Sequence, residues 1–193
     1  MTTRPPKLVA FDLDYTLWPL WIDTHVTPPL RREGDELNAV HDRYDNKISF
    51  YHDVPQILHR LQSAGVIVAA CSRTSAPELA RKALSLLLVP PRAGDKHGPV
   101  KPAIEFFDQM EIYPGSKLTH FRKLQQKTGI PYSEMLFFDD EHRNKEVQAL
   151  GVTFALVRND FTERTFEEGL AAWRQLHPVE VTEDAGGDDV KGI

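Results

Sequence analysis

The sequence predicts an α/β fold in which helices cover both faces of a central parallel sheet. The main observation is that apolar runs typical of buried strands alternate along the chain with helix-like segments. In addition, polar residues directly follow three of these runs. The carboxyl ends of parallel strands meet at one edge of a sheet, where open α/β sheets bind ligands.

Four segments are predicted to be buried strands because each carries a continuous apolar run. They cover residues 7–13, 66–71, 135–138 and 152–157. Residues 18–52 and 89–115 show no regular pattern, and the second stretch holds five prolines. Both stretches are therefore expected to be loops beside the site.

Five segments are predicted to be helices from the residues at their ends. They cover residues 53–64, 75–87, 116–128, 141–150 and 162–176. The start signals are Asp53 as an N-cap, Ser75 with Glu78 as a capping box, and Ser116. Gly65, Gly129 and Gly151 are the stop signals.

Residues 1–178 are predicted to form a single domain. The 193 residues and the hydrophobic content of 41% suit one domain with a core of its own. From residue 180 to the end, five acidic residues stand against the single basic Lys191, a net charge of −4. Residues 179–193 are therefore expected to be an acidic, disordered tail.

Composition excludes several classes of protein. The single Cys71 cannot form an internal disulfide, and no apolar run approaches the length of a membrane span. The N-terminus lacks the apolar region of a signal peptide, so a cytoplasmic location is expected. Without its tail the chain is nearly neutral, which predicts binding to neither nucleic acid nor a membrane surface. A monomer is the default expectation.

The stretch Leu8–Thr16 (LVAFDLDYT) is the most informative part of the chain. Residues two apart on a strand point to the same side, so Asp12 and Asp14 would leave the end of the first strand together. Two carboxylates on one side repel each other, and the usual reasons to keep such a pair are a divalent cation or acid/base chemistry. The alternative is an ordinary turn or helix cap.

Other polar residues are expected at the same edge. Ser72 and Arg73 follow the second strand, and Asp139 and Asp140 follow the third. Ser72 would also suit a cap of the next helix, and either aspartate would suit an N-cap. Lys117 opens a helix, where a cation is unfavourable unless an anion lies close to it.

Four motifs in this order resemble those of the haloacid dehalogenase (HAD) superfamily of phosphohydrolases. They read FDLDYT, AACSRT, PGSK and FFDDEHRN. The longer strings DLDYTLWP, WIDTHV, SRTS, YPGSK and FFDDE are similar to the small eukaryotic-type magnesium-dependent phosphatases of that superfamily. This similarity implies substrates such as phosphotyrosine-like esters, or sugar phosphates such as fructosamine-6-phosphates on proteins. The resemblance covers about residues 7–158, and the proline-rich segment 89–103 looks longer than its counterpart in the family.

This resemblance implies a HAD-like Rossmannoid fold, a three-layer sandwich with a minimal flap and no large cap domain. The intervals 17–52 and 118–138 have only 36 and 21 residues, which is too few for a large cap. An open site is therefore expected. Trp18, Trp21, Phe50 and Tyr51 lie in the first interval, where they would either stack on a substrate or pack the flap onto the body.

By the same resemblance, Mg²⁺ is the cofactor, held by the Asp12 and Asp140 carboxylates and the Asp14 backbone carbonyl. The resemblance further implies that Asp12 attacks phosphorus to form an aspartyl-phosphate. Asp14 would first protonate the leaving oxygen and then deprotonate the attacking water. The charge of Asp12 is expected to raise the pKa of Asp14, so that Asp14 holds its proton.

The remaining motif residues receive supporting roles. Ser72 and Lys117 would hold the phosphoryl oxygens, and Arg73 would add a bidentate contact. Asp139 is expected to support the metal ligands from behind or to cap a helix. Asn144 would orient a water at the metal or lie on the helix surface.

The expected function is therefore hydrolysis of phosphomonoesters on a small molecule or on an exposed protein side chain. A phosphomutase or phosphotransferase, and a non-catalytic phosphate-binding module, are the alternatives on the same fold. The sequence leaves the choice between phosphotyrosine-like and sugar-phosphate substrates open.

Overall fold

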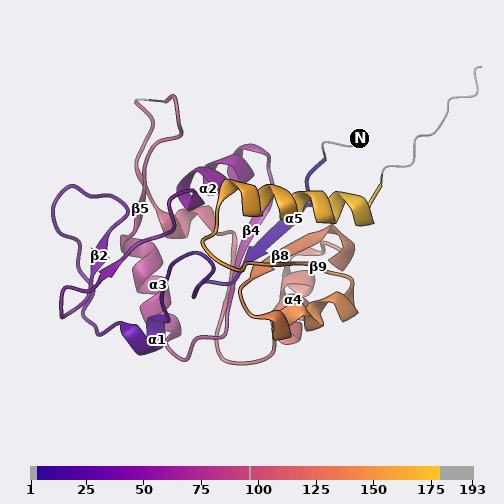
Figure 1. Ribbon diagram of the computed structural model, residues 1–193, viewed down its shortest axis with the longest axis horizontal. Coiled ribbons are helices and arrows are strands. Elements are labelled where there is room, and N and C mark those ends of the chain that lie inside the picture. The colour runs from indigo at the N-terminus through magenta and orange to yellow at the C-terminus, as the bar shows by residue number, and fades with distance from the viewer. Residues whose placement is uncertain (1–3, 96, 179–193) are drawn as a thin grey trace, which may run out of the picture.

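The computed structural model describes residues 4–95 and 97–178 and is built around one five-stranded sheet (Figure 1). The strands, in their order across the sheet, are β7 (Gln109–Ile112), β4 (Ile67–Ser72), β1 (Leu8–Phe11), β8 (Met135–Asp139) and β9 (Thr153–Leu156). All four pairs of neighbours are parallel, which confirms the predicted α/β fold. The tail prediction for residues 179–193 lies outside the described residues.

The order of the strands fixes where a site can form. From the central β1 the chain moves outward through β4 to β7, and it then returns to place β8 on the other side of β1. Phe11 lies level with Ala70 of β4 and with Phe138 of β8. The direction of winding thus reverses beside β1, and crevices at such switch points are the usual ligand sites of open α/β sheets.

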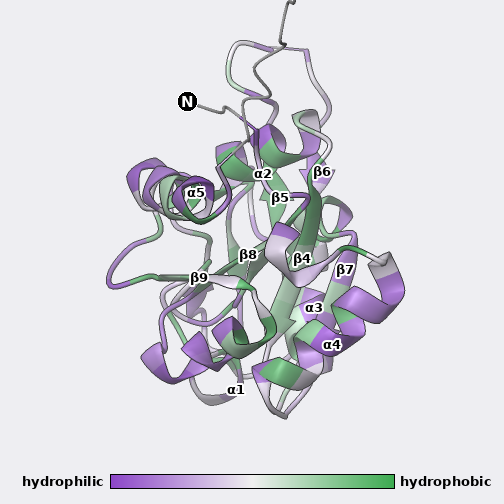
Figure 2. Cartoon of the chain, turned by 90° about the vertical axis from the view of Figure 1, so that its right-hand side faces the viewer, coloured by the Kyte–Doolittle hydropathy of each residue, from purple (hydrophilic) through white to green (hydrophobic). Residues whose placement is uncertain are grey.

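Alternating side chains of the sheet feed two apolar clusters. Val9 and Phe11 of β1 belong to one cluster and Leu8 and Ala10 to the other, as the two-residue period of a strand requires. In Figure 2 the hydrophobic residues concentrate in the strands and on the inner sides of the helices. The sheet is therefore the middle of three layers, as expected.

Helices cover both faces of the sheet. The first cluster includes buried residues of α2 (Val54–Ser63), α3 (Pro77–Leu86) and α5 (Glu163–Leu176). The second includes buried residues of α4 (Lys117–Thr128) and of the 3-10 helix η3 (His142–Leu150). Figure 1 shows α2 and α5 on one side of the strands and α4 on the other.

The packing of α5 depends on a glycine inside the helix. A Cβ atom added to Gly169 would come within 2.4 Å of the ring of Phe138. Glycine costs helix stability in such a position, about 1 kcal/mol relative to alanine. Here it allows α5 to approach β8 closely, beside an aromatic group in which Phe138 also contacts Phe11 and Phe161.

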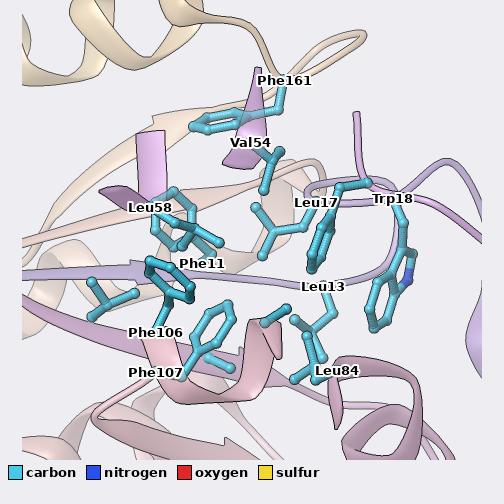
Figure 3. Packing of buried hydrophobic residues seen from close by; sticks show 14 of the residues in the cluster. Phe11, Leu13, Leu17, Trp18, Val54, Leu58, Leu84, Phe106, Phe107 and Phe161 are labelled. Atoms are coloured by element: carbon cyan, nitrogen blue, oxygen red, sulfur yellow. The ribbon is translucent and has the colours of Figure 1, made fainter. Parts of the chain in front are cut away.

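Residues 18–52 form a small flap on the body rather than an irregular loop. The flap contains α1 (Ile22–His25), β2 (Val40–His41) and β3 (Lys47–Ile48). Trp18 is fully buried and stacks on Phe50 with ring centroids 6.0 Å apart, so these two aromatic residues pack the flap onto the core. Figure 3 shows Trp18 beside Leu13 and Leu17 in the apolar cluster.

Several predictions of elements need correction. Residues 89–115 contain β6 (Lys101–Pro102), which pairs with β5 (Leu88–Val89), as well as the 3-10 helix η1 (Ala103–Phe106) and the edge strand β7. Residues 141–150 were expected to be α-helical, but η3 is a 3-10 helix. A short 3-10 helix η2 (Tyr132–Glu134) precedes β8.

The sequence pattern does not predict β7, because a charged residue interrupts its apolar run. Glu111 lies within the strand and is 2% exposed. Lys127 forms an ion pair with its carboxylate, and the Tyr113 hydroxyl donates to it over 2.7 Å. Burial of Glu111 thus depends on partners that only the fold brings together.

The structure confirms the predicted caps of α4 but not the predicted start of α3. Ser116 accepts a hydrogen bond from the backbone of Leu118, and Gly129 ends α4 with a φ of 69°. The capping box at Ser75 is wrong, because α3 begins at Pro77 and its N-cap residue makes no side-chain capping bond. Ser75 instead donates through its backbone N–H and its hydroxyl to Asp23 of the flap.

No helix among the described residues is long and apolar enough to cross a membrane.

Asp42 organises the flap, and we expect its replacement to destabilise the fold in a pH-dependent way. Its buried carboxylate accepts hydrogen bonds from the backbone N–H groups of Thr27, Tyr44 and Asn46. Burial opposes ionisation, but these bonds lower the pKa of Asp42 to about 2. We expect Asp42→Ala to lower the free energy of unfolding by about 2 kcal/mol at pH 7 in urea titrations.

The pKa of Asp42 is lower in the folded chain than in the unfolded chain, so its contribution is present above about pH 4 and is lost as the pH falls toward 2. The difference in free energy of unfolding between wild type and Asp42→Ala should shrink over that range. The control Glu36→Ala removes an exposed partner of Lys47 and should change stability by less than about 0.5 kcal/mol. A difference for Asp42→Ala that stays constant between pH 7 and pH 3 would contradict this account.

Candidate active site

A hollow of about 270 Å³ opens at the carboxyl ends of β1, β4 and β8. Most of the site residues predicted from the sequence line it, namely Asp12, Asp14, Ser72, Arg73, Lys117, Asp140 and Asn144. Asp139 is the exception, since it is fully buried behind the others. The fold therefore brings together residues that are up to 132 positions apart, from Asp12 to Asn144.

Lys117 is the most deeply buried charged group in the hollow, with an exposed fraction of 1%. Its ammonium donates to Asp12 Oδ1 over 2.6 Å and to the backbone carbonyl of Cys71, and it lies 3.1 Å from Asp139 Oδ2. Burial lowers the pKa of Lys117, but the carboxylates of Asp12 and Asp139 outweigh it and raise the pKa above its ordinary value. The ammonium therefore stays charged, and these anions offset its unfavourable place at the start of α4.

Asp12 follows β1 directly, and its backbone N–H continues the sheet by donating to Phe138 over 2.9 Å. Burial raises the pKa of Asp12 above its usual range, against the opposing charge of Lys117. One ammonium thus faces two buried carboxylates, Asp12 and Asp139. Asp140 adds a third acidic group, so the site carries an excess of negative charge when all three are ionised.

One carboxylate oxygen each from Asp12, Asp139 and Asp140 lies within 4.8 Å of the others, which is compatible with a shared cation. The Asp139 carboxylate already has hydrogen-bond donors within the protein. It accepts from the Glu141 backbone N–H over 2.7 Å and from the Asn144 side-chain amide over 2.8 Å. Asp140 has no such partners among the other described residues, and it lines the hollow. Burial and the charges of Asp139 and Glu141 raise its pKa to about 6.

Asn144 links the acidic cluster to the end of β4. Its amide nitrogen donates to both oxygens of Asp139, and its oxygen accepts from Arg73 over 3.2 Å. It is 1% exposed, so it does not lie on an outer helix surface. Asn144 therefore holds Asp139 and Arg73 in fixed positions.

Ser72 ends β4 and is buried at the base of the hollow. Its hydroxyl oxygen accepts from the backbone of Thr74 over 3.3 Å, within the same loop. The alternative role of Ser72 as a cap of the following helix is wrong, because Ala76 occupies the N-cap position of α3.

Asp14 is bound to the flap. Its Oδ1 accepts from the Trp18 indole over 2.7 Å and from the Ile22 backbone over 3.1 Å. The pKa of Asp14 is raised to about 6, as expected in direction, but burial is the main cause rather than the charge of Asp12. Tyr15, the next residue, has a φ of 52°, a left-handed conformation that bends the chain away from the line of β1.

The rim of the hollow contains residues that sequence analysis did not select for chemistry. They are Asp23 and Thr24 of α1, Thr74, and Glu141 and Arg143 beside β8. Asp23 joins the flap to the loop after β4 by accepting two hydrogen bonds from Ser75. Asp23 lies in the string WIDTHV that resembles the magnesium-dependent phosphatases, but no periodicity in this stretch assigns it a role.

Comparison with known proteins relates this geometry to a family. The model of the family described as Acid Phosphatase matches residues 4–176. Magnesium-dependent phosphatase 1 from Homo sapiens is 48% identical over 168 residues, which is 86% of each chain. The HAD-like hydrolase superfamily protein P8B7.31 from Schizosaccharomyces pombe is 50% identical over 149 residues, 77% of this chain and 84% of its own.

A solved structure supports the fold. The chain is similar to a HAD-superfamily hydrolase from Ehrlichia chaffeensis with a TM-score of 0.55 and 10% identity, covering 91% of this chain and 100% of that one. The sequence matches extend over nearly all of the described residues, including every motif that lines the hollow. This chain therefore belongs to the Acid Phosphatase family, within the HAD superfamily, and is a phosphatase.

Proposed function

We propose that this protein is a magnesium-dependent phosphomonoester hydrolase that works through an aspartyl-phosphate on Asp12. The observation that carries the proposal is the position of the Asp12 carboxylate, which contacts the Lys117 ammonium and has an oxygen within 4.8 Å of one from each of Asp139 and Asp140. A carboxylate that attacks a phosphate dianion needs a positive charge close to both groups. Without one, two negative unit charges 4 Å apart repel by about 4 kcal/mol at a protein-like dielectric.

The residues present fit Mg²⁺. This ion prefers oxygen ligands and is usually held by one or two carboxylates, with water and phosphate oxygens as its other ligands. Asp12 and Asp140 would hold it with the backbone carbonyl of Asp14, while Asp139 keeps its protein partners and stays behind them. When bound, Mg²⁺ neutralises the phosphate and keeps Asp12 ionised. The name of the human relative, a magnesium-dependent phosphatase, agrees with this choice of ion.

The reaction then has two halves. In the first, an oxygen of Asp12 forms a bond to phosphorus as the bond to the ester oxygen breaks, and Asp14 gives its proton to that leaving oxygen. In the second, Asp14 takes a proton from water, the water oxygen attacks phosphorus, and the bond to Asp12 breaks. The contacts of Asp14 Oδ1 with Trp18 and Ile22 leave Oδ2 for the proton.

Three further residues support the phosphoryl group. The Ser72 hydroxyl at the end of β4 and the Lys117 ammonium lie at the base of the hollow, where they can stabilise phosphoryl oxygens as these become more negative. Arg73 is held by Asn144 at the rim and offers the remaining N–H groups of its guanidinium.

The same residues would serve a phosphotransferase in the first half of the reaction. The two activities differ only in the second half, where a hydrolase transfers the phosphoryl group to water. Asp14 favours turnover over mere phosphate retention, because its half-buried carboxylate is held by the Trp18 indole and its pKa is raised to about 6. The substrate is a phosphorylated small molecule or an exposed phosphorylated side chain, and the flap covers the body as a small element rather than a large cap domain.

We expect Asp12→Asn to lower phosphate release from p-nitrophenyl phosphate on the order of a thousandfold or more, because the variant lacks the nucleophile. We also expect EDTA to abolish wild-type activity and added Mg²⁺ to restore it. The matched control is Asp35→Asn, at an exposed position of the flap, which should keep wild-type activity. Full activity in EDTA, or a normal rate for Asp12→Asn, would defeat the proposal.

For Asp14→Asn we expect an effect that depends on the leaving group. An alkyl phosphate needs a proton on its leaving oxygen, so its first step should slow by about a hundredfold or more. p-Nitrophenolate leaves without a proton, so the variant should release a rapid burst of it and then turn over slowly, because hydrolysis of the intermediate still lacks its base. Equal slowing of both esters without a burst, in rapid-mixing experiments, would show that Asp14 has another role.

A further inference from the structure

His120 is a buried histidine on α4, one helical turn after Lys117. Residues three apart on a helix lie on the same face, so the two side chains are neighbours. The side chain of His120 is fully buried and does not line the hollow. Burial of a polar side chain costs free energy unless its atoms find hydrogen-bond partners. The partners of His120 therefore indicate what it does.

The partner of His120 is Tyr113, at the end of β7. Nε2 of His120 lies 3.1 Å from the backbone carbonyl oxygen of Tyr113. Because a carbonyl only accepts hydrogen bonds, Nε2 must carry the proton. The two rings also meet edge to face, with centroids 4.4 Å apart. His120 thus binds both the backbone and the ring of Tyr113.

Tyr113 is bound in turn to the end of β4. Its backbone N–H donates to the carbonyl of Ser72 over 3.0 Å, which continues the parallel pairing of β7 with β4. Its hydroxyl donates to the buried carboxylate of Glu111 over 2.7 Å. Tyr113 therefore has a fixed position relative to Ser72, whose hydroxyl we assign to the phosphoryl oxygens.

A short turn connects Tyr113 to Lys117. Only residues 114–116 lie between them, and Gly115 has a φ of 146°, a conformation that other residues rarely adopt. The bond from His120 to the Tyr113 carbonyl joins the two ends of this turn. The Ser72 hydroxyl and the Lys117 ammonium are thus held at a set separation through Tyr113 and His120.

The charge state of His120 suits this arrangement. Burial, helped by the positive charges of Lys117 and Arg73, lowers the pKa of His120 to about 4, although Glu111 opposes the shift. Its Nδ1 is buried and has no hydrogen-bond partner in the described part of the chain, so a proton there would be left unsatisfied. The neutral ring therefore supplies a donor without placing a second positive charge beside Lys117.

From these contacts we infer that His120 is a positioning residue, whose bond to the Tyr113 carbonyl sets Ser72 and Lys117 at the separation that binds a phosphoryl group. The inference rests on the proposed function, because that function assigns Ser72 and Lys117 to the phosphoryl oxygens. His120 does not line the hollow, so it acts through these residues rather than on the substrate.

Two variants separate the hydrogen bond of His120 from its ring. His120→Gln keeps an N–H donor near the place of Nε2 and loses the ring, whereas His120→Phe keeps a ring and loses the donor. We measure the affinity for inorganic phosphate by calorimetry in the presence of Mg²⁺. His120→Gln should bind within about twofold of wild type, and His120→Phe about fivefold more weakly, as expected for one hydrogen bond. The kcat/KM for p-nitrophenyl phosphate should fall in the same order.

His59 offers a matched control at another place in the fold. Its Nε2 lies 2.8 Å from the backbone carbonyl of Pro90, and its ring meets Phe106 edge to face with centroids 4.9 Å apart. His59→Phe therefore removes the same kind of bond and should also destabilise the fold in urea titrations. It should leave the affinity for phosphate unchanged, because His59 does not line or support the hollow.

NMR of the imidazole nitrogens tests the hydrogen bond in wild-type protein, without any variant. We expect a proton on Nε2 of His120 and none on Nδ1 between pH 5.5 and pH 8. A proton on Nδ1 in that range would overturn the proposal. Wild-type affinity for phosphate in His120→Phe, or equal weakening in His120→Gln and His120→Phe, would also overturn it. Loss of turnover in Asp12→Asn would still uphold the proposed function in each of these cases.

Discussion

The site depends on one buried interaction, the binding of the Lys117 ammonium by Asp12, Asp139 and the Cys71 carbonyl. These partners stand at the ends of three adjacent strands, and Lys117 itself begins α4 on one face of the sheet. Breaking a buried ion pair by removing one partner leaves an uncompensated charge, which typically costs about 4 kcal/mol. The same contacts that fix Asp12, the proposed nucleophile, therefore also join the layers of the fold.

The single positive charge of Lys117 does not balance the three carboxyl groups of the site, and the remaining negative charge favours binding of a cation. Asp139 lies closest to the interior and takes its hydrogen bonds from Glu141 and Asn144, so the protein itself satisfies it. Asp12 and Asp140 border the hollow, and burial raises the pKa of both. The adjacent Asp139 and Asp140 thus have different surroundings. Asp139 supports its neighbours, and Asp140 is left available to a cation.

The sequence predicted the parts of the site that follow buried apolar strands. Asp12 and Asp14 come directly after Leu8–Phe11, and the alternation of strands and helices placed Ser72 and Asp140 at the same edge. The edge strand β7 was missed, because the buried Glu111 interrupts its apolar pattern and is satisfied by Lys127 and Tyr113. Similarly, the sequence pattern at Ser75 predicts a local helix cap, whereas its partner Asp23 lies 52 residues away. Patterns in sequence report local preferences and burial, but they do not report partners that meet only after folding.

The proposed reaction requires that Asp12 and Asp140 together bind a divalent cation beside the charged Lys117. Anomalous diffraction from crystals soaked in Mn²⁺, which has a strong signal and accepts similar oxygen ligands, would locate that cation. We expect one peak in contact with both carboxylates in wild-type crystals, and loss of that peak in Asp140→Asn crystals. A peak at another group of acidic residues, or one that persists unchanged in the variant, would refute binding by this pair.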